Sequence, residues 1–241
     1  MRVEPLHAWP QSIQDARALQ ERLRNNVTTS RLKMVPRAVA GVAVESDHGD
    51  ERLFVAVVVV DASTFAVLDQ ATHVRVPEFP ILPGFRSFRD VPPIVEAFKR
   101  LKHTPDVVMI NRQGFAHPMR FGVACHLGLW LRLPTVGCAP TLLTGAPQPL
   151  PQTQGAMAPI LDEDTGEMLS MGIRTRADAE PMFVSVGHQI TLPEAGALVL
   201  AQSMGRRMPM AMKLAHMAAI KLRHSVKGLD PEMAALLKRG V

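Results

Sequence analysis

Tyrosine is absent from this sequence, and cysteine occurs only twice, at Cys125 and Cys138. Two cysteines do not make the disulfide framework of a small secreted domain, and their spacing is not that of a zinc site. No apolar run follows a charged N-terminal segment, and no stretch reaches the apolar length of a membrane span. We therefore expect two small buried cysteines and a cytoplasmic protein with no membrane partner.

What the sequence does contain is typical of a globular protein, with 241 residues of which 47% are hydrophobic and 20% are charged. This length allows one large domain or two small ones, and it is sufficient for a sizeable core. The formal net charge of +5 is compatible with a polyanionic partner, although a basic soluble protein without such a partner has the same charge balance. We find no internal repeat and no linker between domains.

The spacing of apolar residues divides the chain into predicted strands and helices. Three strand-like runs at 38–46, 53–61 and 65–76 follow one another through short turns, the first at 47–50, and they predict an antiparallel meander. Three prolines within residues 77–83 predict a stiff extended loop. Helices are predicted at 12–25, 90–101, 121–131, 193–205 and 209–227, and further strands at 106–110, 135–138, 158–161, 168–174 and 182–186.

The segment from residue 105 to residue 143 predicts a strand, a glycine-containing loop, a helix and a second buried strand. This arrangement is a βαβ unit, whose strands run parallel and whose crossover is right-handed. Ligands bind at the carboxyl ends of such strands, so we expect the functional edge at residues 111–118 and 139–141. Together with the meander, the unit predicts an α/β fold with a mixed sheet flanked by helices.

Three blocks of the sequence resemble the endonuclease V family, in the order that the family has them. GFAHPMRFGVACHLGLWLRLPTVGCA at 114–139 resembles its central block, FPILPGFRSFRD at 79–90 its wedge and catalytic segment, and EPMFVSVGHQITL at 180–192 its late strand. The resemblance implies a ribonuclease-H-like fold, in which residues 43–47 and 110–114 face each other, and a nuclease that cuts beside deoxyinosine. We expect a single domain at 12–227, a loose segment at 1–11 and a C-terminal tail at 228–241.

The resemblance also implies a magnesium site, most of which is changed in this sequence. The family has an aspartate on the first strand, a glutamate after a Phe-Arg pair, an aspartate ending the central strand and a nearby lysine. The matching positions are Ala43, Asp90, Asn111 and Pro140, while His216 keeps the family's residue type. Magnesium needs hard, preferably anionic oxygen ligands beside the scissile phosphate. We therefore expect Asp90 and His216 to be the remnant of the catalytic set, and ordinary family cleavage to be lost.

A second interpretation rebuilds the metal site with Glu45. Side chains two positions apart on a strand share a face, so Glu45 points the same way as Ala43. Its longer side chain would then complete a site with Asp90 and Asn111. The alternative is that Glu45 ends a solvent-facing strand before a polar turn.

The wedge and the base pocket implied by the resemblance are also altered. Ile81 replaces the wedge tyrosine and would lose stacking on a base, worth roughly 1–3 kcal/mol. Ile81 either acts as an apolar wedge or belongs to a hydrophobic loop that packs on its own domain. Gly84, Gly114 and His117 match residues of a pocket for an extruded base, and Gly114 has the alternative role of setting the turn. Arg112 replaces a glycine and would either restrict the pocket or contact a phosphate.

Basic side chains supply the candidates for phosphate contacts. Arg86 and Arg89 flank the wedge segment, Arg120 follows the central strand, and Lys213 belongs to a basic stripe on the last predicted helix. A solvated helix face would carry the same stripe. Further candidates are Arg206, Arg207, Lys221, Arg223 and Lys227.

We therefore predict an endonuclease V-like protein that binds DNA or RNA and whose catalysis is impaired or absent. The first alternative is an active endonuclease that cuts near inosine, with Mg²⁺ held by Asp90, Asn111 and Glu45. The second alternative is a protein-interaction or regulatory subunit without nucleic-acid contact. Salt-dependent binding to nucleic acid would distinguish the main prediction and the active endonuclease from the protein-interaction subunit. Metal-dependent cutting would distinguish the active endonuclease from the main prediction.

Overall fold

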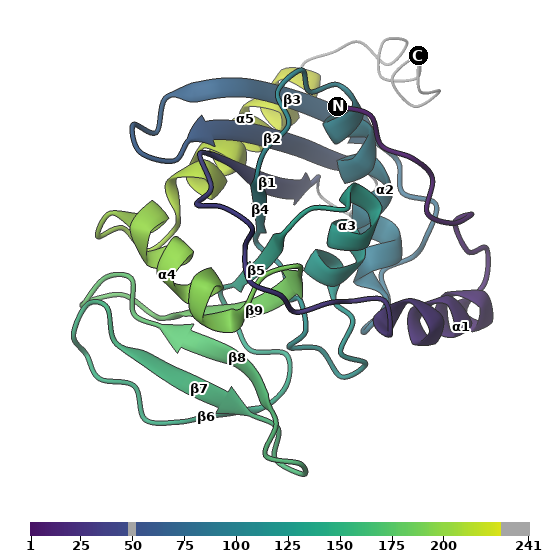
Figure 1. The fold of residues 1–241 in the computed structure, drawn as a ribbon. Helices are drawn as coiled ribbons and strands as arrows, with labels where there is room; N and C mark the ends of the chain where they lie inside the picture. Colours follow the sequence, from purple (N-terminus) through teal and green to yellow (C-terminus); the bar gives the residue numbers. More distant parts are fainter. Residues whose placement is uncertain (48–51, 228–241) are drawn as a thin grey trace.

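The computed structural model describes residues 1–47 and 52–227, which form a nine-stranded sheet with helices on both faces (Figure 1). The strands are β1 (Ala38–Ser46), β2 (Leu53–Asp61), β3 (Val67–Arg75), β4 (Val107–Ile110), β5 (Thr135–Ala139), β6 (Ala146–Pro147), β7 (Met157–Leu161), β8 (Met168–Ile173) and β9 (Met182–His188). The helices are α1 (Ile13–Arg24), α2 (Arg86–Lys99), α3 (Val123–Leu131), α4 (Leu192–Ser203) and α5 (Met210–Lys227). None of the helices in these two ranges is both long and apolar enough to cross a membrane.

The sheet joins a meander to a parallel unit, as the sequence predicts. Its strand order is β3-β2-β1-β4-β5-β9-β8-β7-β6, with β1, β4 and β5 parallel and the other neighbours antiparallel. The pairing of β1 with β4 ends at Val42 and Ile110, so Ala43 and Asn111 follow next to each other at one edge. That edge is where open α/β sheets bind their ligands.

Strand β2 explains why the sheet is covered on both faces. Its residues are buried from Leu53 to Val60, so neither face meets water. Val55, Val57 and Val59 pack in a core with α2 and α3, while the alternate residues pack in a second core with α4 and α5. A strand that is apolar at successive positions requires two covered faces.

Gly41 in β1 allows α5 to lie directly on the sheet. A Cβ atom at Gly41 would stand 2.1 Å from backbone atoms of Ala211, so no larger residue fits without displacing the helix. The close approach brings the following turns of α5 over the carboxyl end of β1.

Helix α1 packs outside α3 through apolar side chains such as Leu19 and Leu23, and one buried side-chain amide adds hydrogen bonds to two loops. The Oγ atom of Ser12 accepts a hydrogen bond from the amide of Asp15 at 3.1 Å, which confirms the predicted N-cap. Gln20 is buried and donates through Nε2 to the carbonyl oxygens of Gly84 at 3.0 Å and Phe121 at 3.2 Å. These bonds connect α1 to two loops that meet at the site described below.

Residues 1–11 contain no helix or strand, but they have specific contacts with α3. The ring of Trp9 is stacked on that of Trp130, with centroids 4.8 Å apart. The indole Nε1 of Trp130 donates to Nε2 of His7 at 3.1 Å. The segment that we predicted to be loose is therefore packed on the domain. The predicted tail at 228–241 and residues 48–50 of the predicted turn lie outside the described residues.

Helix α2 begins at Arg86 rather than at Asp90, where the sequence pattern places its start. Pro92 and Pro93 lie inside the helix, where each lacks an N–H donor, and Phe85 at the N-cap makes no side-chain capping bond. No ordinary start signal therefore marks Arg86. The earlier start places Arg86 and Asp90 one helical turn apart, where their side chains meet.

Candidate functional site

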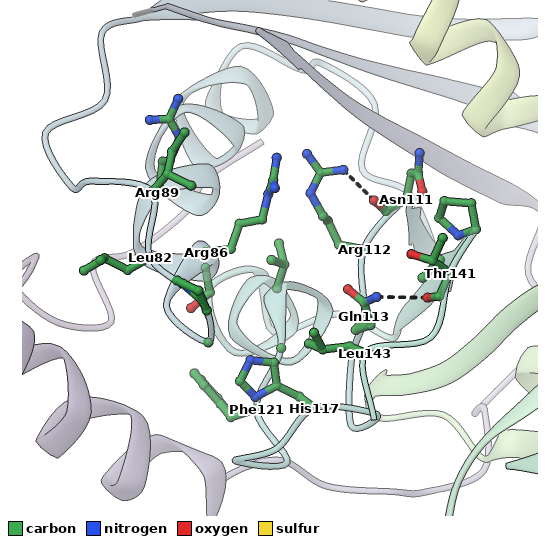
Figure 2. Close-up of a pocket in the computed structure, with 18 residues that line it drawn as sticks. Leu82, Arg86, Arg89, Asn111, Arg112, Gln113, His117, Phe121, Thr141 and Leu143 are labelled. Carbon is green, nitrogen blue, oxygen red and sulfur yellow. Dashed lines mark hydrogen bonds between the residues drawn. The ribbon is translucent and has the colours of Figure 1, made fainter. Parts of the chain in front are cut away.

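A cavity of about 440 Å³ lies at the carboxyl ends of β4 and β5, beside the start of α2 (Figure 2). The predicted edges at 111–118 and 139–141 both contribute to it, and the described residues that line it include no aspartate and no glutamate. Its apolar lining includes Ile81, Leu82, Pro83, Gly84, Phe121, Pro140 and Leu143. Its polar side chains are Arg86, Ser87, Arg89, Asn111, Arg112, Gln113, His117 and Thr141.

Asp90 adjoins the cavity without lining it, because two arginines bind its carboxylate. Arg86 Nε lies 3.1 Å from Asp90 Oδ2, and Arg112 Nε lies 2.9 Å from the same oxygen. The side chain of Asp90 is 0% exposed, against 17% for Arg112 and 55% for Arg86. The two guanidinium groups, rather than the carboxylate, therefore face the cavity.

Few oxygen atoms remain at this position for a metal ion. Oδ1 of Asp90 and Oδ1 of Asn111 are buried and accept no hydrogen bond within the described residues. Only the first belongs to a charged group, and Ala43 has no ligand atom to add. No group of three or more His, Cys, Asp or Glu residues in 1–47 and 52–227 is arranged to hold a metal.

Electrostatics also disfavours a divalent cation beside Asp90. One carboxylate attracts a dication at about 2.5 Å by roughly 13 kcal/mol when the effective dielectric constant is about 20. Arg86 and Arg112 lie 3.1 and 2.9 Å from the same carboxylate oxygen, so two positive charges stand close to any cation at Asp90 and repel it. The repulsion by Arg86 and Arg112 opposes the attraction of the single carboxylate, so the residues present do not fit the magnesium ion that the resemblance implies.

Glu45, the third predicted metal ligand, is bound to other partners. Its Oε1 lies 2.9 Å from Nδ1 of His216, and its Oε2 lies 3.7 Å from Nη1 of Arg223. Alternation along β1 turns Glu45 toward α5, on the same side as Ala43, which packs in the core beneath that helix. His216, the second predicted catalytic remnant, thus pairs with Glu45 and does not line the cavity beside Asp90.

His117 lines the cavity as the resemblance implies, and it is uncharged at neutral pH. Burial lowers the pKa of His117 to about 4, and the positive charge of Arg120 acts in the same direction. Its Nδ1 accepts a hydrogen bond from the amide of Met119 at 3.1 Å. Gly84 lies beside it with φ at +78°, a conformation that glycine adopts readily.

Gly114 and Lys213, two predicted nucleic-acid contacts, lie outside the cavity. The amide of Gly114 donates to Ser185 Oγ at 2.8 Å, and a Cβ atom there would lie 2.1 Å from the carbonyl oxygen of Val186. Glycine is therefore needed at this position for packing against β9. Lys213 is exposed on α5, whereas the predicted wedge residue Ile81 is exposed at the rim of the cavity.

Arg120 and Arg89, also predicted to contact phosphates, are largely enclosed. Arg120 binds Asp162 at 2.6 Å and Glu167 at 2.9 Å, which fastens the β7–β8 hairpin to the loop after β4. Arg89 is buried, and Figure 2 shows its guanidinium to one side of Arg86 and Arg112. Arg86 and Arg112 are thus the predicted arginines whose guanidinium groups the structure brings together.

Two glutamines support the cavity, although the sequence pattern did not predict a role for either of them. Gln113 Nε2 donates to the carbonyl of Thr141 at 3.2 Å and joins the loops that follow β4 and β5 (Figure 2). Gln20 connects α1 to the loops at Gly84 and Phe121. Gln113 stands inside the predicted functional edge, whereas nothing distinguishes Gln20 from the other polar residues of α1.

Comparisons with known proteins agree with the resemblance over most of the chain. The family profile described as Endonuclease V matches residues 20–217. Endonuclease V from Roseiflexus castenholzii is 39% identical over 203 residues, which cover 84% of this chain and 90% of the relative. The crystal structure of endonuclease V from Streptomyces avermitilis has a TM-score of 0.86 at 33% identity, covering 92% of this chain and 97% of that one.

A more distant structure has the same fold. Endonuclease V from Ciona intestinalis, in complex with a 23mer DNA containing an inosine followed by a ribo-adenosine, is 22% identical with a TM-score of 0.78. The match covers 88% of this chain and 98% of that one. The mixed sheet with flanking helices is the ribonuclease-H-like fold that the resemblance implies. By its sequence and its structure, this chain belongs to the endonuclease V family.

Proposed function

We propose that this chain is a nucleic-acid-binding member of its family that does not carry out metal-dependent cleavage. The observation that carries the proposal is the double ion pair of Asp90 with Arg86 and Arg112, at the position where the resemblance implies a metal-binding glutamate. Both guanidinium groups bind Oδ2, so a magnesium ion beside a phosphate would have one buried oxygen of this carboxylate, Oδ1, and two positive charges opposing it.

The other altered positions support the same conclusion. Ala43 is buried in an apolar core, and Pro140 lines the cavity where the resemblance implies a lysine. Neither residue stabilises negative charge that develops on a phosphate during cleavage. A loss of about 4 kcal/mol of such stabilisation slows a reaction by about a thousandfold.

Nucleic-acid binding is supported by the charge of the protein and by a relative. The net charge is +5, and three arginines line the cavity. Arginines that neutralise phosphates release condensed counterions, which favours binding to DNA and RNA alike. The Ciona relative holds an inosine-containing DNA.

The test is a combined cleavage and binding assay of the full chain. Labelled oligonucleotides with a single inosine, as single-stranded DNA, duplex DNA and RNA, are incubated with magnesium and with manganese. We expect a gel shift that weakens steeply with salt, and no metal-dependent product.

Asp90→Ala and Glu45→Ala variants, assayed in parallel, identify the source of any cleavage. Cutting by the unmodified chain that disappears in either variant would contradict the proposal. It would instead support the alternative metal site of Asp90, Asn111 and Glu45. The absence of both binding and cutting would also contradict the proposal and favour a protein-interaction subunit.

A further inference from the structure

The arginines that cover Asp90 leave most of their own donors unused. An arginine side chain has five N–H groups. Arg86 uses its Nε for Asp90, while Arg112 uses its Nε for Asp90 and its Nη1 for the carbonyl of Asn111 at 2.7 Å. Neither guanidinium makes another hydrogen bond within the described residues. Both Nη groups of Arg86 and the Nη2 group of Arg112 are therefore available to a ligand.

Asp90 determines how these donors are presented. A single oxygen, Oδ2, accepts from Nε of both arginines, so the two guanidinium groups lie next to each other at the cavity (Figure 2). Asp90 is fully buried within α2, so its carboxylate is a fixed point of the fold. Guanidinium groups held in this way lose less conformational freedom on binding than mobile surface side chains.

The cavity also has a surplus of positive charge. Arg86 and Arg112 bring two positive charges against the single negative charge of Asp90. No acidic residue lines the cavity within the described part of the chain. His117 is neutral at neutral pH because its pKa is lowered to about 4. The surplus favours an anionic ligand.

The size and the lining of the cavity favour the phosphate of a nucleotide over a small free anion. The fork of a guanidinium group matches phosphate oxygens through paired hydrogen bonds. A volume of about 440 Å³ lies within the range of small-molecule sites and exceeds what a free phosphate fills. Ile81, Leu82 and Leu143 offer apolar contact to the uncharged part of a nucleotide.

We propose that the cavity is a metal-independent phosphate site, in which Arg86 and Arg112, positioned by Asp90, bind the phosphate group of a nucleotide unit. The proposal rests on the proposed function, because it requires that no divalent cation occupy this position. The phosphate has two sources with the same chemistry: an internal phosphodiester of a strand, or the terminal phosphate of a strand or a mononucleotide.

The test measures binding to the full chain by fluorescence anisotropy, first in EDTA and then with magnesium. The probes are a 3′-labelled oligonucleotide with a 5′-hydroxyl group and the same strand with a 5′-phosphate. AMP and inorganic phosphate serve as competitors. Arg112→Gln and Arg86→Gln are compared with Arg132→Gln, which removes the same charge from a side chain that is 74% exposed and lies outside the cavity.

We expect Arg112→Gln and Arg86→Gln each to weaken binding about tenfold or more in EDTA. Each should also reduce the slope of log K against log salt by about 1, whereas Arg132→Gln should change affinity less than about twofold. Magnesium should not increase the affinity. Tighter binding of the 5′-phosphorylated strand that Arg112→Gln abolishes would assign the site to terminal phosphates. Equal binding of the two strands would assign it to internal phosphodiesters.

The role of Asp90 has a separate test. Asp90→Asn retains both arginines but not the charge that aligns them. At about 0.3 M salt, where long-range attraction is screened, we expect this variant to bind more weakly than the unmodified chain. Asp90→Glu, which restores a carboxylate, should recover most of the affinity. Unchanged binding by Asp90→Asn at this salt concentration would show that the Asp90 carboxylate does not position the two arginines for binding.

Equal affinities of the cavity variants and Arg132→Gln, in proteins that unfold cooperatively, would overturn the proposal. Arg86→Gln decides the matter if Arg112→Gln does not fold, because the Arg86 side chain is mostly exposed. A requirement for magnesium would also overturn it. The proposed function fails separately, through metal-dependent cutting. A protein that binds without cutting and tolerates both cavity substitutions refutes only the phosphate site.

Discussion

Two carboxylates near the carboxyl ends of the central strands each contact two basic side chains, yet their surroundings differ. Asp90 is inaccessible to solvent, and both of its partners, Arg86 and Arg112, are charged at every physiological pH. Glu45 is 23% exposed, and its nearest partner is His216, whose side chain is 41% exposed. The two clusters also lie on different helical layers, since Asp90 belongs to α2 and Glu45 meets α5.

Burial decides what each cluster contributes. Removal of one partner from a buried ion pair leaves an uncompensated charge and destabilises a protein by about 3–5 kcal/mol. An ion pair near the surface contributes less than about 1 kcal/mol, because water screens it. The metal-site hypothesis groups Asp90 and Glu45 around one ion. In the structure Asp90 belongs to a buried ion-pair cluster beside the cavity, whereas Glu45 belongs to a weaker, partly exposed one.

Asp90→Ala should produce the largest loss of stability among changes to the two clusters. The substitution leaves Arg112, which is mostly enclosed, without its carboxylate, while Arg86 is exposed enough to regain water. We expect the free energy of unfolding to fall by about 3 kcal/mol, near the lower end of the buried-pair range. Urea denaturation followed by circular dichroism measures this change through the midpoint. A loss below about 1 kcal/mol would place Asp90 in the same class as Glu45.

The sequence predicts most of this fold, because its buried strands are recognisable from short, continuous runs of apolar and β-branched residues. The apolar run of β2 and the short β-branched run of β4 fit only a covered sheet, and both strands form where predicted. The start of α2 was misplaced because Phe85 provides no cap and two prolines follow inside the helix. Residues 1–11 were predicted to be loose because they carry Pro5 and Pro10. The stacking of Trp9 on Trp130 joins residues far apart in the chain and leaves no periodic pattern in the sequence.

The position of the cavity was also predictable, but its charge pairing was not. Parallel strands place residues 111–118 and 139–141 at one edge, and both segments line the cavity. The bond from Arg112 to Asp90 joins the end of β4 to α2, so it depends on tertiary packing rather than on local spacing. The partner of Glu45 was missed for the same reason, because His216 is 171 residues away in the chain.

Acid should lower the free energy of unfolding through His117, which lines the cavity beside Asp90. The pKa of His117 is lowered to about 4 in the folded state, against a usual value near 6.5, so the unfolded state takes up a proton first as pH falls. The stabilising contribution is therefore complete above about pH 6.5 and decreases toward pH 4. Between about pH 7.5 and about pH 5 we expect a loss of about 2 kcal/mol from this residue, measured by urea denaturation.

The matched variant is His117→Asn, which keeps an acceptor for the amide of Met119 and removes the titrating group. Its stability should depend less on pH than that of the unmodified chain by the same amount. Burial also lowers the pKa values of other histidines, which remain in both proteins, so only the difference between the two curves reports on His117. Parallel curves would show that His117 titrates normally. These other histidines are His7, His73, His126 and His188.

Glu45→Gln should have the smallest effect and should thereby complete the comparison. The glutamine keeps an oxygen that accepts from His216 Nδ1 and loses only the charge that attracts Arg223 across 3.7 Å. We expect the free energy of unfolding to change by less than about 1 kcal/mol, and by less still at high salt, because exposed charges are screened. Asp90→Asn, which makes the same chemical change at the buried carboxylate, is the control and should cost more than Glu45→Gln at every salt concentration. Equal losses in the two variants would mean that burial does not separate the clusters, and the assignment of Asp90 as the anchor of the arginine pair would then have no energetic basis.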